Sequence, residues 1–182
     1  MRFTRAIVRP PAATFVAGIT TSGLGPPDLA VALEQHEAYC RTLERLGLSL
    51  SRLAPDPEFP DSTFVEDAAI ATSRGAILTG PGAASRAGEV ASLGAALGQW
   101  FPELDRIGAP GTVDGGDVCE AGDHLFIRVS DRTNAQTTDV VPLPANKSST
   151  VSPGLVAIAR AARSSRSASA LGDQPIRALA VT

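Results

Sequence analysis

Carboxylates gather in two short stretches of the chain, and each stretch could bind a planar cation. Residues 59–67 hold three acids, and residues 111–117 place two glycines between two acids. Because guanidinium donates several hydrogen bonds in one plane, clustered carboxylates are its natural acceptors. Turn acids, helix caps and solvated charge are the alternative explanation for each stretch taken alone. The acids are Asp61, Glu66, Asp67, Asp114 and Asp117.

Cysteine and histidine are scarce, and only two pairs of them could do chemistry. The chain of 182 residues has two Cys and two His. His36 and Cys40 are four residues apart on one predicted helix, so they could form a nucleophile–base pair or half a metal site. Cys119 and His124 face each other across a predicted hairpin. Two ligands make a weak metal site and free Cys is usually buried, so we interpret both pairs as structural and predict no metal.

The overall composition excludes several classes of protein. Apolar residues make up 43 % and charged residues 19 %, which is typical of a folded globular chain. No apolar run approaches the roughly 18 residues of a bilayer span. The net charge is −3, and no basic cluster precedes residue 160, which argues against nucleic acid as a partner. Met1–Pro11 lacks the apolar segment of a signal peptide, so we expect a cytoplasmic protein that binds neither nucleic acid nor membrane.

The chain changes character near residue 137. All eight aromatic residues, both Cys and both His lie in residues 1–136, and residues 137–182 have none of them. Ala, Ser and Arg are common in this second segment, as they are in shifted reading frames of GC-rich DNA. We therefore predict a domain at residues 1–136, followed by a divergent and weakly ordered tail at residues 137–182. The chain is interpreted as a truncated or frameshifted product.

Apolar periodicity in the first 136 residues predicts alternating strands and helices. Strand–strand–helix–strand units recur at about 60 residues, which indicates an α/β repeat architecture. One helix is predicted at residues 29–43, capped by Asp28 and ended by Gly47, with an apolar stripe of Leu29, Leu33, His36, Cys40 and Leu43. A second helix is predicted from Ser85, as its cap, to about Phe101. Strands are predicted at residues 3–8, 48–53, 63–71, 75–79, 107–113, 118–120 and 124–129.

Five motifs, in their order along the chain, resemble the dimethylarginine dimethylaminohydrolases of the guanidine-modifying superfamily. The resemblance covers about residues 1–136 and implies a partial α/β propeller, pentein-like, of ββαβ modules that is incomplete at its C-terminus. It also implies a cofactor-free hydrolase that converts methylated arginine to citrulline and a methylamine through a cysteine thiolate. The implied partner is a small guanidino substrate, and self-association could cover the missing modules. The motifs are Leu33-Glu34-Gln35-His36 through Tyr39, Phe59–Asp67, Pro81-Gly82-Ala83 with Ser85-Arg86, Gly111–Asp117, and Arg132-Thr133-Asn134.

The same resemblance implies roles for individual residues. Asp114 matches the acid that orients the family's catalytic His, and Ile19 falls in a loop that closes over the substrate. Five residues match substrate-binding positions, with acids at the guanidinium and arginines at the amino-acid end: Asp61, Glu66, Asp67, Arg86 and Arg132.

The family's Cys and His lie further along its chain than any Cys or His here. Cys119, His36 and His124 match neither of them, so the chain is expected to be inactive alone. The alternatives are a non-catalytic arginine-binding remnant and an unrelated small α/β protein.

Overall fold

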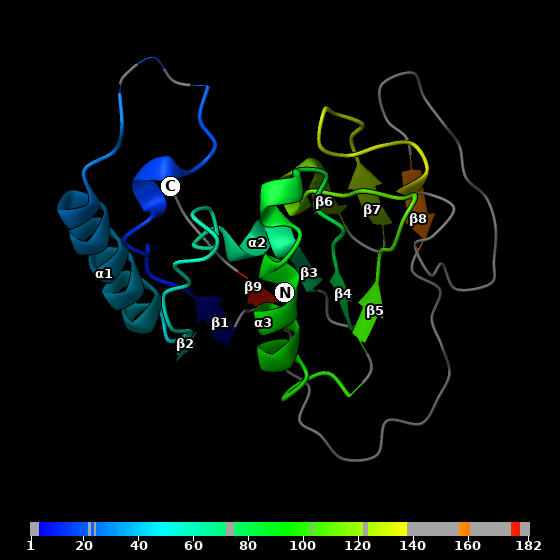
Figure 1. The fold of residues 1–182 in the computed structure, drawn as a ribbon. Helices are drawn as coiled ribbons and strands as arrows, with labels where there is room; N and C mark the ends of the chain where they lie inside the picture. Colours follow the sequence, from blue (N-terminus) through cyan, green and yellow to red (C-terminus); the bar gives the residue numbers. More distant parts are fainter. Residues whose placement is uncertain are drawn as a thin grey trace.

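Within the part of the chain that the structure describes, three small sheets of three strands each carry the fold (Figure 1). The computed structural model describes residues 4–21, 23, 25–71, 75–102, 104–121, 124–137, 157–160 and 176–178. Three short 3-10 turns lie at Phe15–Ala17, Ala84–Arg86 and Gly115–Asp117. The helices and strands are β1 (Arg5–Val8), α1 (Leu29–Arg45), β2 (Ser49–Arg52), α2 (Val65–Ala68), β3 (Ala69–Ala71), β4 (Ala76–Leu78), α3 (Glu89–Leu97), β5 (Leu104–Arg106), β6 (Val118–Ala121), β7 (His124–Ile127), β8 (Ala157–Arg160) and β9 (Ile176–Ala178).

The strand order confirms an α/β architecture built from repeated units. In the first sheet β1 lies between β2 and β9 and runs parallel to both. In the second, β3 and β4 are antiparallel, and β5 returns parallel to β4 after α3. This second sheet with α3 is one strand–strand–helix–strand module. The third sheet, β6-β7-β8, is antiparallel. Figure 1 shows α1 at one end, with the three sheets following from it. The sheets form a partial propeller, and the described strands do not close a ring.

The core lies on both faces of β1 because a parallel strand is normally covered on both sides. Ile7 packs with Leu78, Leu93 and Leu97 between the strands and α3. Its neighbours Ala6 and Val8 point to the opposite face, where they pack with Cys40 and Leu43 of α1. A third cluster of Ile70, Ile107 and Val113 joins the second sheet to the loop that precedes β6. None of the described helices has the length and apolar character needed to cross a bilayer.

The ends of α1 follow the sequence prediction, but its apolar stripe does not. The Asp28 carboxylate accepts hydrogen bonds from the amides of Ala30 and Val31, so it caps the helix as expected. Gly47 has a φ of 88° directly after the helix, a conformation that favours glycine. The predicted stripe is wrong in its first half, since Leu33 is 40 % exposed. Only the C-terminal half of α1 packs on β1 and β2, through Cys40 and Leu43.

The predicted strand at residues 63–71 is half helix. Residues Val65–Ala68 form the single turn α2, and only Ala69–Ala71 are extended as β3. Val65 and Ala68 are both buried, at the i, i+3 spacing of one helical face. The Thr63 hydroxyl also donates to the carbonyl of Arg9 at 2.8 Å, which fixes the chain before the turn. Tertiary contacts here override the strand propensity of Phe and Val.

Two further predictions are corrected between residues 85 and 113. Helix α3 begins at Glu89 with Gly88 as its N-cap and ends at Leu97, so Ser85 is not the cap and the helix stops short of Phe101. Phe59 fills the space where a Cβ on Gly88 would lie. The strand predicted at residues 107–113 is instead β5 at Leu104–Arg106, and the residues after it form a loop.

Several predictions lie outside the described residues. These are the turn at Ser73-Arg74, the turn at Gly122-Asp123, the side chain of His124 and the weak order of the tail, of which only Thr137 and the backbones of β8 and β9 are described. The flanking hairpin strands are present as β6 and β7.

Candidate functional site

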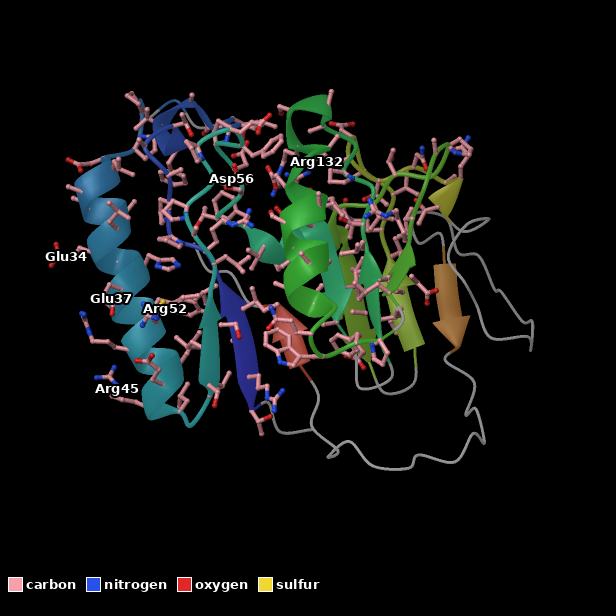
Figure 2. The ribbon with its side chains drawn as sticks, turned by 60° about the horizontal axis from the view of Figure 1, so that its bottom comes forward. Glu34, Glu37, Arg45, Arg52, Asp56 and Arg132 are labelled. Atoms are coloured by element: carbon pink, nitrogen blue, oxygen red, sulfur yellow. The ribbon has the colours of Figure 1, made fainter. Side chains whose placement is uncertain are left out.

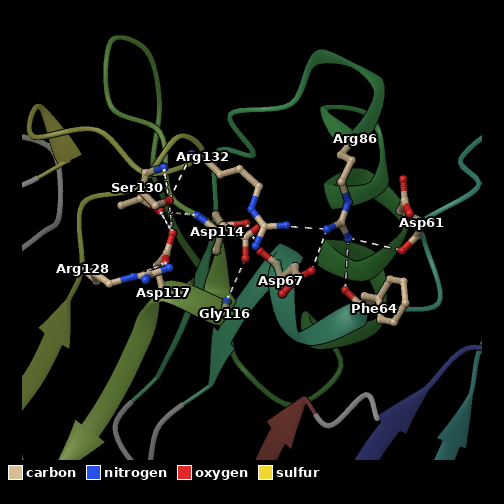
Figure 3. Close-up of polar contacts among 12 residues, drawn as sticks. Asp61, Phe64, Asp67, Arg86, Asp114, Gly116, Asp117, Arg128, Ser130 and Arg132 are labelled. Carbon is tan, nitrogen blue, oxygen red and sulfur yellow. Dashed lines mark hydrogen bonds and ion pairs between the residues drawn. The ribbon is translucent and has the colours of Figure 1, made fainter. Parts of the chain in front are cut away.

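Loops from four separate parts of the chain bring the predicted site residues together (Figure 3). Asp67 lies on α2, and Arg86 ends the 3-10 turn after β4. Asp114 lies before β6, and Arg132 follows β7. The loop at Gly115 approaches α2 so closely that the carbonyl of Glu66 occupies the space of a Cβ on Gly115. Glycine at this position therefore allows the close approach that sets Asp114 beside Asp67.

Arg86 is the centre of the cluster. Its side chain is 5 % exposed, and its Nη1 contacts Asp67 Oδ2 at 2.6 Å. Its Nε and Nη2 donate to the Glu89 carboxylate at 3.0 and 2.8 Å, a two-pronged arrangement that fixes the plane of the guanidinium. Nη2 also donates to the carbonyls of Asp61 and Phe64, both at 3.3 Å. Burial alone would lower the pKa of Arg86, but the bonds to Glu89 and Asp67 more than offset it, so the pKa is raised.

Asp114 is buried next to the Arg86 cluster and has three polar neighbours. Its Oδ1 accepts from the Gly116 amide at 2.9 Å, and its Oδ2 lies 3.2 Å from Arg132 Nε and 4.0 Å from Arg86 Nη1. Burial and the charge of Asp67 raise the pKa of Asp114. A Cβ on Gly116 would lie 3.0 Å from Asp114 Oδ1 and 3.2 Å from Asp67 Oδ1, so the two carboxylates meet over this glycine.

Asp61 and Ile19, two of the predicted site residues, contact each other directly. Both carboxylate oxygens of Asp61 lie 3.1 Å from the Ile19 amide nitrogen, and Asp61 is 6 % exposed. A Cβ on Gly18 would come within 2.6 Å of the same carboxylate. The side chain of Ile19 remains 56 % exposed. Asp61 therefore anchors the backbone of the loop that was expected to cover the substrate.

Glu66 is a partly buried carboxyl group beside this cluster. Burial raises its pKa to about 7, and the neighbouring charge of Asp67 adds to the shift. Its Oε2 is buried and has no hydrogen-bond partner among the described residues. Glu66 is therefore the carboxyl group here whose protonation changes near neutral pH.

Glu89 and Arg9 of this region were not identified from the sequence, and Asp117 was identified only as one of the clustered acids, without a role of its own. Glu89 lies three residues after Arg86, a spacing that could have suggested their ion pair. Arg9 is buried and donates to Ser92 Oγ at 2.7 Å. Asp117 accepts from Arg128 and from the hydroxyls of Ser130 and Thr133 at 2.5 and 2.7 Å. Burial alone would raise the pKa of Asp117, but these bonds reverse the effect and lower it.

The His36–Cys40 pair lies on α1, apart from this cluster, and Cys119 pairs with Phe126 across the hairpin rather than with His124 as predicted. His36 Nδ1 is 3.7 Å from Cys40 Sγ, but Cys40 is fully buried. Burial raises the pKa of Cys40 and lowers that of His36, which favours a neutral thiol beside a neutral imidazole. Cys40 is therefore a core residue, as predicted. Cys119 is exposed on β6. The described residues contain no group of three or more His, Cys, Asp or Glu side chains that could hold a metal ion.

Comparison with known proteins gives relatives that match up to about three quarters of the chain. The chain is 49 % identical over 135 residues to N(G),N(G)-dimethylarginine dimethylaminohydrolase of Pseudomonas aeruginosa, covering 74 % of this chain and 53 % of that protein. It is 36 % identical over 132 residues to the protein of the same name from Streptomyces coelicolor, covering 72 % of this chain and 51 % of that one. No family model matches the chain. The chain spans about half the length of the curated relatives it matches.

Solved structures agree with these relatives. A Cys-to-Ser variant of the Pseudomonas aeruginosa enzyme in complex with citrulline matches with a TM-score of 0.75 and 47 % identity, over 76 % of this chain and 55 % of that chain. The N-terminal domain of a cyanobacterial arginine dihydrolase matches with a TM-score of 0.65 and 17 % identity, over 73 % of this chain and 51 % of that chain, which shows the fold alone.

Proposed function

The chain is a relative of the dimethylarginine dimethylaminohydrolases, and we propose from this relationship that it binds the guanidinium group of methylated arginine. The observation that carries the proposal is a pair of carboxylates, the buried Asp114 and the partly buried Asp67, which meet over Gly116. Two carboxylates this close together and largely removed from water are unfavourable without compensating cations. A guanidinium ligand supplies a positive charge and planar donors to the same oxygens.

The proposed roles follow from how tightly each side chain is held. Asp67 and Glu66 receive the guanidinium, and Arg86 positions Asp67 through the 2.6 Å contact. Asp61 holds the backbone at Ile19, so that the exposed Ile19 side chain can cover the ligand. Arg132, which is half-exposed and contacts Asp114, binds the carboxylate at the amino-acid end. In a full-length hydrolase Asp114 would orient the catalytic His.

We further propose that this chain binds its ligand without hydrolysing it, as a cytoplasmic protein that uses no cofactor. In the family's reaction a thiolate adds to the guanidinium carbon, methylamine leaves, and water releases citrulline. Cys40 is fully buried and its pKa is raised, so it does not supply that thiolate. Cys119 is exposed on β6 and matches no catalytic position of the family. This placement of both cysteines favours a non-catalytic guanidino-binding protein over a hydrolase.

Calorimetry and a citrulline assay together test the two parts of the proposal. Titration of the full chain with dimethylarginine should give saturable heat, and Asp67→Asn should abolish it. The matched control Asp105→Asn changes an exposed carboxylate on β5 and should leave binding intact. Incubation with dimethylarginine should give no citrulline. Turnover that Cys119→Ser abolishes would overturn the proposed lack of activity, and absence of heat from the wild-type chain would overturn the binding function.

The change in composition at residue 137 supports a proposal about origin and domain organisation. We propose that residues 1–136 form the main folded domain and that residues 137–182, which add β8 beside β7 and β9 beside β1, come from a shifted reading frame. A second reading frame in the parent DNA that encodes a late His and Cys would support this origin. Limited proteolysis should remove the tail and leave residues 1–136 intact, and cleavage inside α1 or α3 at equal rates would contradict the boundary.

A further inference from the structure

Arg9 is a buried arginine that directly follows β1. The residue is 3 % exposed. Its Nη2 donates to Ser92 Oγ on α3 at 2.7 Å, and its Nη1 lies 3.8 Å from Asp56 Oδ2. Its main-chain carbonyl accepts from the Thr63 hydroxyl at 2.8 Å. Arg9 therefore contacts three segments that are far from it along the chain.

Two of these contacts lie directly before residues of the proposed ligand site. Asp56 begins the turn that precedes Asp61, since its carbonyl accepts from the Phe59 amide at 3.3 Å. Thr63 comes just before α2, which carries Asp67. The end of β1 is thus tied to the chain on both sides of Asp61.

The third contact, with Ser92, reaches Arg86 through the first turn of α3. Ser92 Oγ donates in turn to the carbonyl of Glu89 at 3.3 Å. The Glu89 carboxylate accepts from Arg86 Nε and Nη2, and Arg86 Nη1 contacts Asp67 Oδ2 at 2.6 Å. A chain of hydrogen bonds, continued through Glu89 itself, therefore runs from Arg9 to Asp67.

The stability of the fold alone does not explain why an arginine is buried here. Its Nε is buried and has no hydrogen-bond partner among the described residues, and an unmet buried donor costs free energy. Burial also lowers the pKa of Arg9, an effect that the charges of Asp56 and Glu89 oppose. Neither acid depends on Arg9, because the Asp56 side chain is 22 % exposed and Glu89 is paired with Arg86. A well-packed apolar side chain in its place would therefore cost the fold little.

We propose that Arg9 is a positioning residue for the ligand site: it holds the first turn of α3, and Glu89 in that turn orients Arg86. Arg86 in turn positions Asp67 for the ligand's guanidinium. This inference rests on the proposed function. A site that is already held in its binding geometry loses less free energy when the ligand binds. A change at Arg9 should therefore weaken binding more than it weakens the fold.

The test uses Arg9→Met, Ser92→Ala and a matched control, Ser49→Ala, which removes an exposed hydroxyl on β2. Calorimetric titration of the full chain with dimethylarginine should show about tenfold weaker binding for R9M and about threefold weaker binding for S92A. S49A should bind as wild type does. Alanine favours a helix more than serine does, so weaker binding by S92A cannot come from a less stable α3.

A signal of Arg86 itself separates positioning from a purely structural role. The Arg86 Nε–H group donates to Glu89, and its NMR signal can be followed with no ligand present. R9M and S92A should shift this signal and speed its exchange with water, because the Glu89 carboxylate is no longer held in place. S49A should leave the signal unchanged.

The outcomes distinguish this inference from the proposed function. Unchanged Arg86 Nε signals in both R9M and S92A would overturn the inference, and so would shifted signals with dimethylarginine affinities equal to that of wild type. If R9M does not fold, S92A decides both measurements. If wild type gives no heat with dimethylarginine, the proposed function fails, and the Arg86 signal alone then decides whether Arg9 positions the cluster.

Discussion

The ion pairs around Arg86 and those around Arg52 have similar contact distances but very different exposure to solvent. Arg52 faces two carboxylates, and Arg86 faces two at short distance with Asp114 further away at 4.0 Å. The side chain of Arg86 is 5 % exposed, whereas that of Arg52 is 41 % exposed on the α1 side of the molecule (Figure 2). The contacts are Arg86–Asp67 at 2.6 Å, Arg86–Glu89 at 2.8 Å, Arg52–Glu37 at 2.7 Å and Arg52–Glu44 at 3.3 Å.

The difference in burial determines how much these contacts of similar length contribute to stability. Water and salt screen the charges around Arg52, and two long side chains must be ordered to hold each pair, so the net stabilisation is small. Around Arg86 water does not replace a lost partner, and removal of one charge leaves another buried and uncompensated. The Arg86 cluster therefore fixes the positions of four loops relative to one another. The Arg52 group lies on the surface of α1 and β2 and contributes little to stability.

Arg86→Met should give the largest loss of stability. Because it leaves the Glu89 and Asp67 carboxylates without their main cation, we expect the free energy of unfolding to fall by about 3 to 5 kcal/mol. Urea denaturation of the full chain measures the change. Arg86→Lys keeps the charge but not the two-pronged geometry, so it should lose less. A loss no larger than that of the corresponding change at Arg52 would contradict the comparison.

Asp117→Asn should have the next largest effect. The carboxylate accepts from Arg128 and from the hydroxyls of Ser130 and Thr133, and charge-assisted bonds are stronger than neutral ones. We expect a loss of about 2 kcal/mol in the free energy of unfolding. Amide hydrogen exchange should show the loss concentrated in residues 128–134. Uniform loss of protection across the chain would instead indicate that Asp117 has no local role.

Glu66 should make stability depend on pH. Its carboxyl has a pKa of about 7 in the folded chain against 4.5 for a free glutamate, so the folded state binds the proton more tightly. This contribution is fully present below pH 4.5 and is lost as pH rises through 7. Since Glu66 is partly exposed, we expect a loss of about 1 to 2 kcal/mol across that window.

Glu66→Gln should remove this part of the pH dependence. The measurement is urea denaturation at several pH values between 4.5 and 7. Glu34→Gln removes an exposed carboxylate on α1 and controls for the loss of a charge. Identical profiles for wild type and E66Q would show that Glu66 does not titrate as described.

Arg52→Met should have the smallest effect. We expect the free energy of unfolding to change by no more than about 0.5 kcal/mol, because the ion pairs it breaks are exposed. Added salt should reduce the effect further. A loss comparable with that of R86M would show that contact distance, rather than burial, governs these pairs.

The parts of the fold that depend on local signals were predictable from the sequence. The Asp28 cap, Gly47 after α1 and the β6–β7 hairpin each rest on residues that are close along the chain. Helix α2 was not predictable, because the turn at Val65–Ala68 depends on the distant backbone at Arg9 and Gly115. The sequence also did not predict that the first half of the apolar stripe of α1 is exposed, because helix periodicity does not show how far a sheet extends beneath the helix.

The sequence allowed the residues of the candidate site to be predicted, but not their arrangement in space. Motif order brought Asp67, Asp114 and Arg132 into one hypothesis, and the structure places them together. The sequence did not show that Arg86 turns inward, because this requires Glu89 to be buried at the first turn of a helix that begins later than predicted. Asp117 looked like an ordinary turn acid, and only the loop after β7 gives it its partners.

A guanidinium site at the carboxylates of Asp67 and Asp114 is tested most directly by amide NMR. The Gly116 amide donates to Asp114 Oδ1, and the Ala30 amide donates to Asp28 at the distant start of α1. Addition of dimethylarginine to the full chain should shift the Gly116 signal saturably and leave the Ala30 signal in place. No shift of Gly116 at millimolar ligand, or equal shifts at both amides, would contradict the account.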